Sequence, residues 1–126
     1  MATKLSWRTL CRGLRTTVEG DEVVVFFENG RSHRVSLEET TDTVELEAIV
    51  AGAAAVRDVP DLPVRIWQHN HAAQLVSFRI DERGRVRARG WVPKAGLTEE
   101  EFQLMLRRVA TESDRLEFLL TGRDQQ

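Results

Sequence analysis

Apolar residues near the start of the chain recur with the period of a helix. They share spacings of three and four positions, which place them on one side of a helix: Trp7, Leu10, Cys11, Leu14 and Val18. This spacing predicts a helix over residues 5–18. Gly13 lies inside the segment and weakens the prediction, since glycine costs about 1 kcal/mol relative to alanine in a helix. We expect the helix to end at Gly20–Asp21.

The next part of the chain has the pattern of three antiparallel strands. Residues 23–27 form a β-branched and aromatic run typical of a strand, and the Asn29–Gly30 pair that follows favours a hairpin with a type I′ turn. Apolar and polar residues alternate over 32–37 and again over 43–50. Together these segments predict an antiparallel meander with one face toward water.

Two further strands are expected after a short helix. Pro63 suits the first turn of a helix over residues 62–73, because its missing N–H needs no partner there. Strands follow over 75–80 and 85–92, joined by a turn at 81–84 in which Gly84 can take a left-handed conformation.

The last predicted element is a long helix after Thr98. Thr98 and Glu101 have the spacing of a capping box, in which the side chain of each residue accepts a hydrogen bond from the free backbone N–H of the other. A stripe of helical period follows, and Gly122 is placed to end it. The stripe consists of Phe102, Met105, Leu106, Val109, Ser113, Leu116 and Leu120. The whole order, α-β-β-β-α-β-β-α, predicts an α+β fold with an antiparallel sheet.

Composition narrows the class of protein. A chain of 126 residues fits one domain, 1–126, and 41% hydrophobic with 30% charged residues is typical of a globular protein. The net charge of -2 gives no basic footprint for nucleic acid, so such a partner is disfavoured. Cys11 is the single cysteine, and the first residues contain no apolar stretch long enough to predict a signal peptide. The longest apolar run, residues 48–56, is too short to predict a membrane span. We therefore expect a cytoplasmic protein without a membrane partner.

The second half of the chain carries a family resemblance. It combines Asn70 before a strand, an Asp-x-x-Gly turn at 81–84, and the stretch 92–102 leading into a helix that ends at Gly122. In these features the chain resembles the YbjN-like branch of the type III secretion chaperone-like fold. The resemblance implies a protein that binds client or partner proteins without catalysis and that often dimerises.

The residues show no catalytic or cofactor site. Zinc needs three or four ligands close together, and the sequence places no cysteine or carboxylate pair near His33, His69 or His71, so no metal site is predicted. Cys11 lies on the apolar side of its predicted helix, where a cysteine acts as a small hydrophobe. Glycine-rich phosphate loops and a nucleophile elbow are absent from the sequence. We expect no enzyme activity and no cofactor.

Arginines on one strand face are the candidate binding residues. Arg85, Arg87 and Arg89 alternate with small apolar residues, Arg79 can join them from the neighbouring strand, and Trp91 shares their parity. One interpretation pairs them with Glu45 and Glu47 across the sheet, or with acidic residues of the last helix. The other makes them a docking surface for a partner, with Trp91 either exposed as a hot spot or covered by a helix.

These observations lead to one main hypothesis and one alternative. The main hypothesis is a non-enzymatic protein-binding domain, chaperone-like or a regulatory adaptor, acting as a homodimer. The alternative is a nucleic-acid-binding or regulatory module that uses the arginine-rich strand face.

Overall fold

The computed structural model describes residues 7–11, 15–72 and 74–122. Its strands are β1 (Thr16–Glu19), β2 (Glu22–Phe26), β3 (Ser32–Glu39), β4 (Thr43–Ala51), β5 (Ser77–Ile80) and β6 (Val86–Pro93). Its helices are α1 (Trp7–Leu10), α2 (Ala53–Val56), α3 (Leu62–Ala72) and α4 (Glu99–Thr121). The predicted α+β class with an antiparallel sheet is confirmed.

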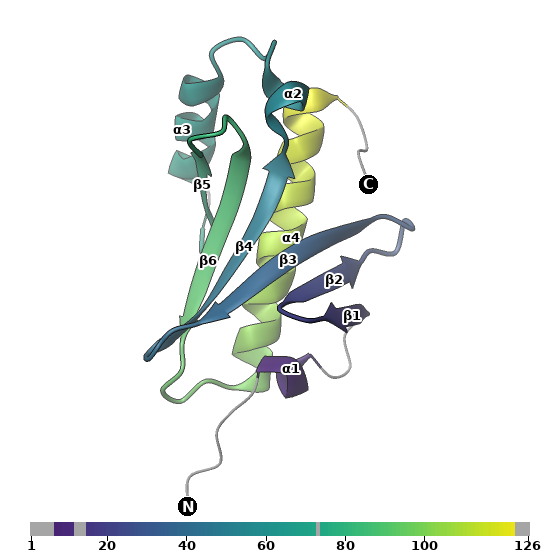
Figure 1. Ribbon diagram of the computed structural model, residues 1–126, viewed down its shortest axis with the longest axis vertical. Coiled ribbons are helices and arrows are strands. Elements are labelled where there is room, and N and C mark those ends of the chain that lie inside the picture. The colour runs from purple at the N-terminus through teal and green to yellow at the C-terminus, as the bar shows by residue number, and fades with distance from the viewer. Residues whose placement is uncertain (1–6, 12–14, 73, 123–126) are drawn as a thin grey trace, which may run out of the picture.

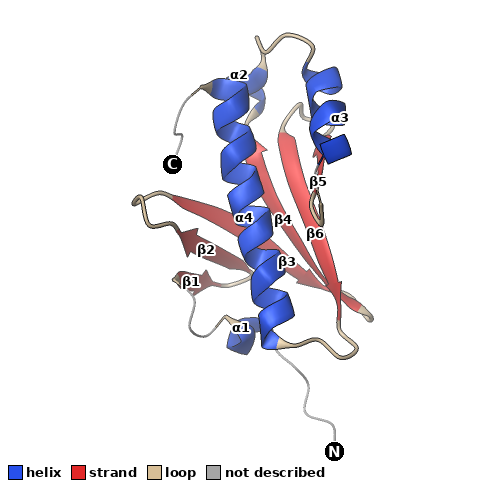
Figure 2. Cartoon of the chain, turned by 180° about the vertical axis from the view of Figure 1, so that it is seen from behind, coloured by secondary structure: helices blue, strands red, loops and turns tan. Residues whose placement is uncertain are grey.

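The six strands form one antiparallel sheet in the order β1-β2-β3-β4-β6-β5. The long helix α4 runs across one face of this sheet, and α3 lies beside β5 at its far edge (Figure 1). Seen from behind, α4 lies in front of the sheet along most of its length (Figure 2). The opposite face, which we call the open face, carries no helix of the described chain.

The core lies between the sheet and α4 because both present apolar residues at the expected period. Strand residues alternate between buried and accessible along β3, β4 and β6. The predicted stripe on α4 is buried throughout, with Phe102, Leu106 and Val109 fully enclosed. Burial of such side chains contributes roughly 1.5–3 kcal/mol each relative to exposure.

Gly90 lets α4 approach the sheet closely. A Cβ atom at Gly90 would lie 2.6 Å from Met105 Sδ and 3.1 Å from Val109 Cγ2, closer than side chains normally pack. Glycine in the middle of β6 therefore reflects this contact between layers.

The ends of α4 follow the prediction. The Thr98 hydroxyl accepts a hydrogen bond from the Glu101 backbone N–H, and the Glu101 side chain accepts one from the Thr98 N–H, as a capping box requires. Gly122 ends the helix in the left-handed conformation with φ 69°.

The predicted helix over residues 5–18 is wrong in its second half. α1 covers only Trp7–Leu10, and Thr16–Glu19 forms β1, which pairs with β2 through a two-residue turn. Gly20, with φ 62°, occupies the first turn position, as a type II′ turn favours. Residues 5 and 6 and residues 12–14 of the prediction lie outside the described part of the chain.

The β2–β3 hairpin is confirmed, but its turn is of another kind. Only Gly30 in this loop has a positive φ, at 86°, whereas a type I′ turn needs two such residues. The Gly30 N–H donates to the Phe27 carbonyl (3.1 Å) and the Phe27 N–H to the Arg31 carbonyl (2.8 Å). This is a three-residue loop in which a glycine follows a tight turn.

The remaining differences concern the element order. The structure has six strands where five were predicted, and a short helix α2 follows β4. The predicted helix over 62–73 corresponds to α3, and the predicted strands over 75–80 and 85–92 correspond to the shorter β5 and to β6.

Candidate functional site

The open face of the sheet presents the arginines that the strand parity placed together. Arg87, Arg89 and Trp91 of β6 point to this face. The residues that alternate with them along the strand point the other way and are buried, among them Val86, Ala88 and Val92. Arg79 lies directly opposite Arg87 on β5. Arg85 precedes β6 in the turn. Trp91 is 56% exposed and no described helix covers it.

Carboxylates engage each of these arginines. Arg87 pairs with both Glu47 and Asp81, and Arg89 pairs with Glu45. Arg79 Nη2 lies 3.6 Å from Glu47 Oε2, and Arg85 Nε lies 2.8 Å from Asp81 Oδ2. The pairing of Glu45 and Glu47 with the arginines across the sheet is therefore present. Their register makes it possible, since Glu45 lies opposite Trp91 and Glu47 opposite Arg89 on β6.

Asp81 organises the turn between β5 and β6. Its Oδ1 accepts hydrogen bonds from the backbone N–H groups of Arg83 and Arg85, both 2.9 Å long. Its Oδ2 accepts from the Nε atoms of Arg85 and Arg87, both 2.8 Å long. The Arg87 guanidinium, and then the Arg85 donors, hold the pKa of the Asp81 carboxyl well below its usual range.

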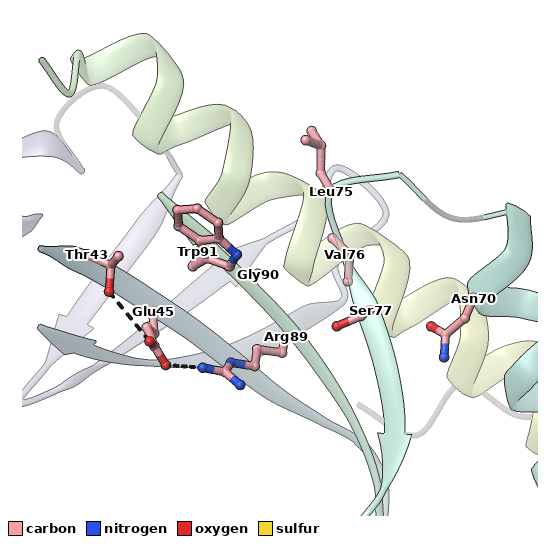
Figure 3. A pocket seen from close by; sticks show the side chains of 9 residues that line it. All are labelled: Thr43, Glu45, Asn70, Leu75, Val76, Ser77, Arg89, Gly90 and Trp91. Atoms are coloured by element: carbon pink, nitrogen blue, oxygen red, sulfur yellow. Dashed lines mark hydrogen bonds and ion pairs between the residues drawn. The ribbon is translucent and has the colours of Figure 1, made fainter. Parts of the chain in front are cut away.

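A hollow of about 580 Å³ lies at the end of the open face where β5 begins. Figure 3 shows its lining, with the Glu45 carboxylate between Thr43 and Arg89 and the Trp91 side chain nearby. The lining residues are Thr43, Glu45, Asn70, Leu75, Val76, Ser77, Arg89, Gly90 and Trp91. Of the predicted site residues, the hollow contains Arg89 and Trp91. Arg79, Arg85 and Arg87 lie outside it.

The contribution of Leu75 to this hollow could not be predicted from the sequence. Leu75 was predicted as the first residue of a strand, but it precedes β5, is 56% exposed and has a φ of 69°. A bulky residue with positive φ is strained, and such strain is concentrated at binding and switch regions. No local sequence pattern identifies this conformation.

Part of the β6 edge beside the hollow has no partner strand. The β5–β6 register ends at Ser77 opposite Arg89, whereas β6 continues to Pro93. On the side away from β4, the described chain therefore adds no strand along residues 90–93. Backbone groups at such an edge can hydrogen-bond an added extended segment.

The outer edge of β5 is closed by Asn70 of α3. The Asn70 side chain donates to the Phe78 carbonyl (2.7 Å) and accepts from the Phe78 N–H (2.6 Å), as a neighbouring strand would. The two histidines that flank Asn70 contact different rings. His69 meets Phe78 edge-on at 4.9 Å, and His71 stacks on Trp67 at 5.6 Å.

Cys11 is buried, as its apolar neighbours predicted. Its Sγ donates to the Trp7 carbonyl at 3.5 Å. Burial raises the pKa of the Cys11 thiol, which disfavours the nucleophilic thiolate.

The fold with this sheet and helix arrangement occurs in solved structures. The chain superposes on a chain of the ExsC–ExsE complex with a TM-score of 0.59 and 19% identity, covering 83% of this chain and 80% of the other. A chain of the HopA1–SchA chaperone–effector complex superposes with a TM-score of 0.56 and 11% identity, covering 91% of this chain and 89% of the other. YbjN from E. coli, for which a role as a transcription regulator has been suggested, superposes with a TM-score of 0.60 and 14% identity, covering 92% of this chain and 87% of the other.

These similarities confirm the type III secretion chaperone-like fold that the second half of the sequence predicted. At 11–19% identity they establish the fold alone. No protein-family profile and no curated protein matches the sequence. Within the described residues, no helix has the length and apolar character needed to cross a membrane.

Proposed function

We propose that this chain is a non-enzymatic, chaperone-like protein-binding domain that holds a partner polypeptide and acts as a homodimer in the cytoplasm. The observation that carries the proposal is the fold similarity to chains from two protein–protein complexes, one of which is a chaperone–effector complex. The domain would then contribute a surface, with no catalytic residues and no cofactor.

The hollow beside β6 is the part of the surface best suited to a polypeptide. It joins an unpartnered strand edge to two exposed apolar side chains, Trp91 and Leu75. Main-chain hydrogen bonds to an edge give affinity for an extended segment, and side-chain pockets beside it give specificity. Aromatic anchors of this kind often carry much of the binding energy.

The polar residues of the hollow would set its preference for a partner. Arg89 and Glu45 are paired to each other, so the hollow offers both a donor and an acceptor rather than a strong net charge. Nothing in this arrangement favours nucleic acid, because the arginines of the open face are already engaged by carboxylates. An extended peptide of mixed polar and apolar character fits the hollow better.

Affinity purification from the native host with three baits tests the proposal. We expect one polypeptide to be enriched on wild-type protein and reduced at least tenfold on Trp91→Ala, because truncation removes the exposed aromatic anchor. Phe26→Ala is the matched control. Phe26 is 40% exposed but belongs to β2, which β3 and β4 separate from β6, and its substitution should retain the partner.

The enriched polypeptide is then purified and its dissociation constant measured with the same three proteins. Equal affinity for wild type and Trp91→Ala would remove the hollow from the proposal. Failure of every bait to enrich a specific polypeptide would contradict the proposed function itself.

A further inference from the structure

A cluster of buried ionisable groups lies between β3 and α4, away from the open face. His33 of β3 points into the core and is 3% exposed, and Glu117 of α4 is 5% exposed. Asp114, one turn before Glu117, is half-buried. A ring nitrogen of His33 and one carboxylate oxygen from each acid lie within 4.8 Å of one another. We call these three residues the His33 cluster.

The hydrogen bonding of His33 leaves one ring nitrogen available. Nε2 lies 3.1 Å from the Ile49 carbonyl oxygen, which can only accept, so Nε2 carries the proton and donates. In the neutral ring, Nδ1 then has a free lone pair. It is fully buried and has no hydrogen-bond partner among the described residues, and the same holds for Asp114 Oδ1.

Burial favours the neutral form of this ring. It lowers the pKa of His33, outweighing the hydrogen bond to Ile49 and the attraction of Asp114, which act in the opposite direction. A neutral imidazole is the form that binds metal ions. A buried acceptor without a partner is costly, so the arrangement indicates that another group satisfies it.

We propose that His33, Asp114 and Glu117 bind a divalent transition-metal ion, with Zn²⁺ as the best-matched species. Imidazole nitrogen and carboxylate oxygen are common zinc ligands, and a ligating histidine usually donates its other N–H to a backbone carbonyl or carboxylate, as His33 does to Ile49. Calcium and magnesium prefer oxygen ligands alone. This inference does not depend on the proposed binding of a partner.

Zinc binding would draw the three ligand atoms together. In a tetrahedral site with zinc–ligand bonds of about 2.0–2.2 Å, two ligand atoms lie roughly 3.3–3.6 Å apart, whereas the three atoms here lie within 4.8 Å of one another. Water would complete the coordination, since three protein ligands leave a position open.

The Arg31 guanidinium would compete with a metal ion for Asp114. It follows the β2–β3 loop and forms an ion pair with Asp114 Oδ2. A bound ion would share or displace this guanidinium from Asp114, and Arg31 has a path to solvent because its side chain is 22% exposed. Binding would thus tie the β2–β3 hairpin to α4 through the metal.

A zinc titration of the full, tag-free chain tests the site, using competition with a chromogenic chelator at pH 7.5. We expect one equivalent of Zn²⁺ to bind wild type, with binding abolished in His33→Asn and weakened at least tenfold in Glu117→Gln. The control is the double variant His69→Ala/His71→Ala, which removes the other two histidines and should bind as wild type does. Far-UV circular dichroism verifies the fold of each variant.

Cobalt absorption provides a second measurement of the same site. Bound Co²⁺ should give visible bands typical of nitrogen and oxygen ligation in wild type and in the control, and Zn²⁺ should displace it. Binding below one equivalent in wild type, or unchanged in a folded His33→Asn variant, would overturn the proposal, as would loss of binding in the control. If His33→Asn does not fold, unchanged affinity in a folded Asp114→Asn/Glu117→Gln variant overturns it equally.

Discussion

Asp81 shows how much one side chain can organise on this sheet. Its two oxygens accept four hydrogen bonds, two from backbone N–H groups of its own turn and two from Arg85 and Arg87. The turn, the start of β6 and the positions of Arg85 and Arg87 therefore depend in part on a single carboxylate. An ionised acceptor makes such bonds stronger than a neutral one would.

We expect Asp81 to stabilise the fold only where it is ionised. Its pKa in the folded chain lies below the ordinary value of 3.8, so its contribution is fully present above pH 3.8 and is lost as the pH falls toward the folded pKa. Urea unfolding should show Asp81→Asn less stable than wild type at pH 7. The difference should shrink steadily below pH 3.8.

Glu82→Gln serves as the control for this prediction, because Glu82 is an exposed carboxylate of the same turn that lies outside the arginine ion pairs described above. The Glu82→Gln substitution should leave the free energy of unfolding close to that of wild type both at pH 7 and at pH 2. A difference between Asp81→Asn and wild type that stays constant down to pH 2 would contradict the assignment of the effect to ionisation.

Asn70 has an equivalent role at the level of elements, since it joins α3 to the edge of β5. β5 has only four residues and pairs with β6 on one side. On its other side, the Asn70 amide takes the place of a strand at Phe78. Edge strands invite pairing with other chains unless they are covered, so this contact also protects the sheet.

We expect Asn70→Ala to lower the free energy of unfolding by about 1–3 kcal/mol, because it leaves the Phe78 N–H and carbonyl without their partner. Asn70→Asp keeps the acceptor for the Phe78 N–H and loses the donor to the Phe78 carbonyl. Its loss of stability should therefore be smaller than that of Asn70→Ala. Gln68→Ala is the matched control, at an exposed position of the same helix. Urea unfolding gives the stabilities, and hydrogen exchange at Phe78 locates the effect. Unchanged exchange at Phe78 in Asn70→Ala would disprove it.

The whole molecule is two layers with different surfaces on its two sides. The sheet's inner face is covered by α4, and the open face carries paired charges with Trp91 at one end. A second group of exposed apolar residues lies at the end of the molecule formed by α3 and the last turn of α4. It consists of Val64, Trp67, Phe118 and Leu119. Arg65 of α3 donates a hydrogen bond to the Leu119 carbonyl of α4 (3.0 Å), which links the two helices there.

We expect this apolar end to contribute to the proposed homodimer. Size-exclusion chromatography with light scattering should give a mass near twice 14.4 kDa for wild type. Trp67→Glu should shift the mass toward one chain, because a charge would be buried at the contact. Leu104→Glu, at an exposed site near the other end of α4, should remain dimeric. A wild-type mass of one chain at all concentrations would refute the homodimer.

Much of the fold could be predicted because its signals are local. Alternation defined β3, β4 and β6, and it placed Arg87, Arg89 and Trp91 on one face. The Thr98–Glu101 capping box and Gly122 defined α4 to within a residue at each end. Side-chain parity and capping depend only on near neighbours, so the sequence contains them in full.

The misassigned first helix shows where this locality fails. Trp7, Leu10 and Cys11 have a helical spacing and are buried, but Val18 continued that spacing by coincidence and is exposed in β1. β1 exists because β2 offers it an edge, with Gly20 making the turn. Pairing with a neighbour outweighed the pattern of the segment itself.

By itself, the sequence determined the α+β class, most of the strands, the arginine face and the long capped helix. Only the tertiary structure decided what the faces contain. The hollow arises because β5 begins at Ser77 opposite Arg89, so that residues 90–93 of β6 extend past it. Leu75, just before β5, has a positive φ there. His33 meets two carboxylates only because α4 crosses beneath β3. Such contacts join residues far apart along the chain, and no local periodicity encodes them.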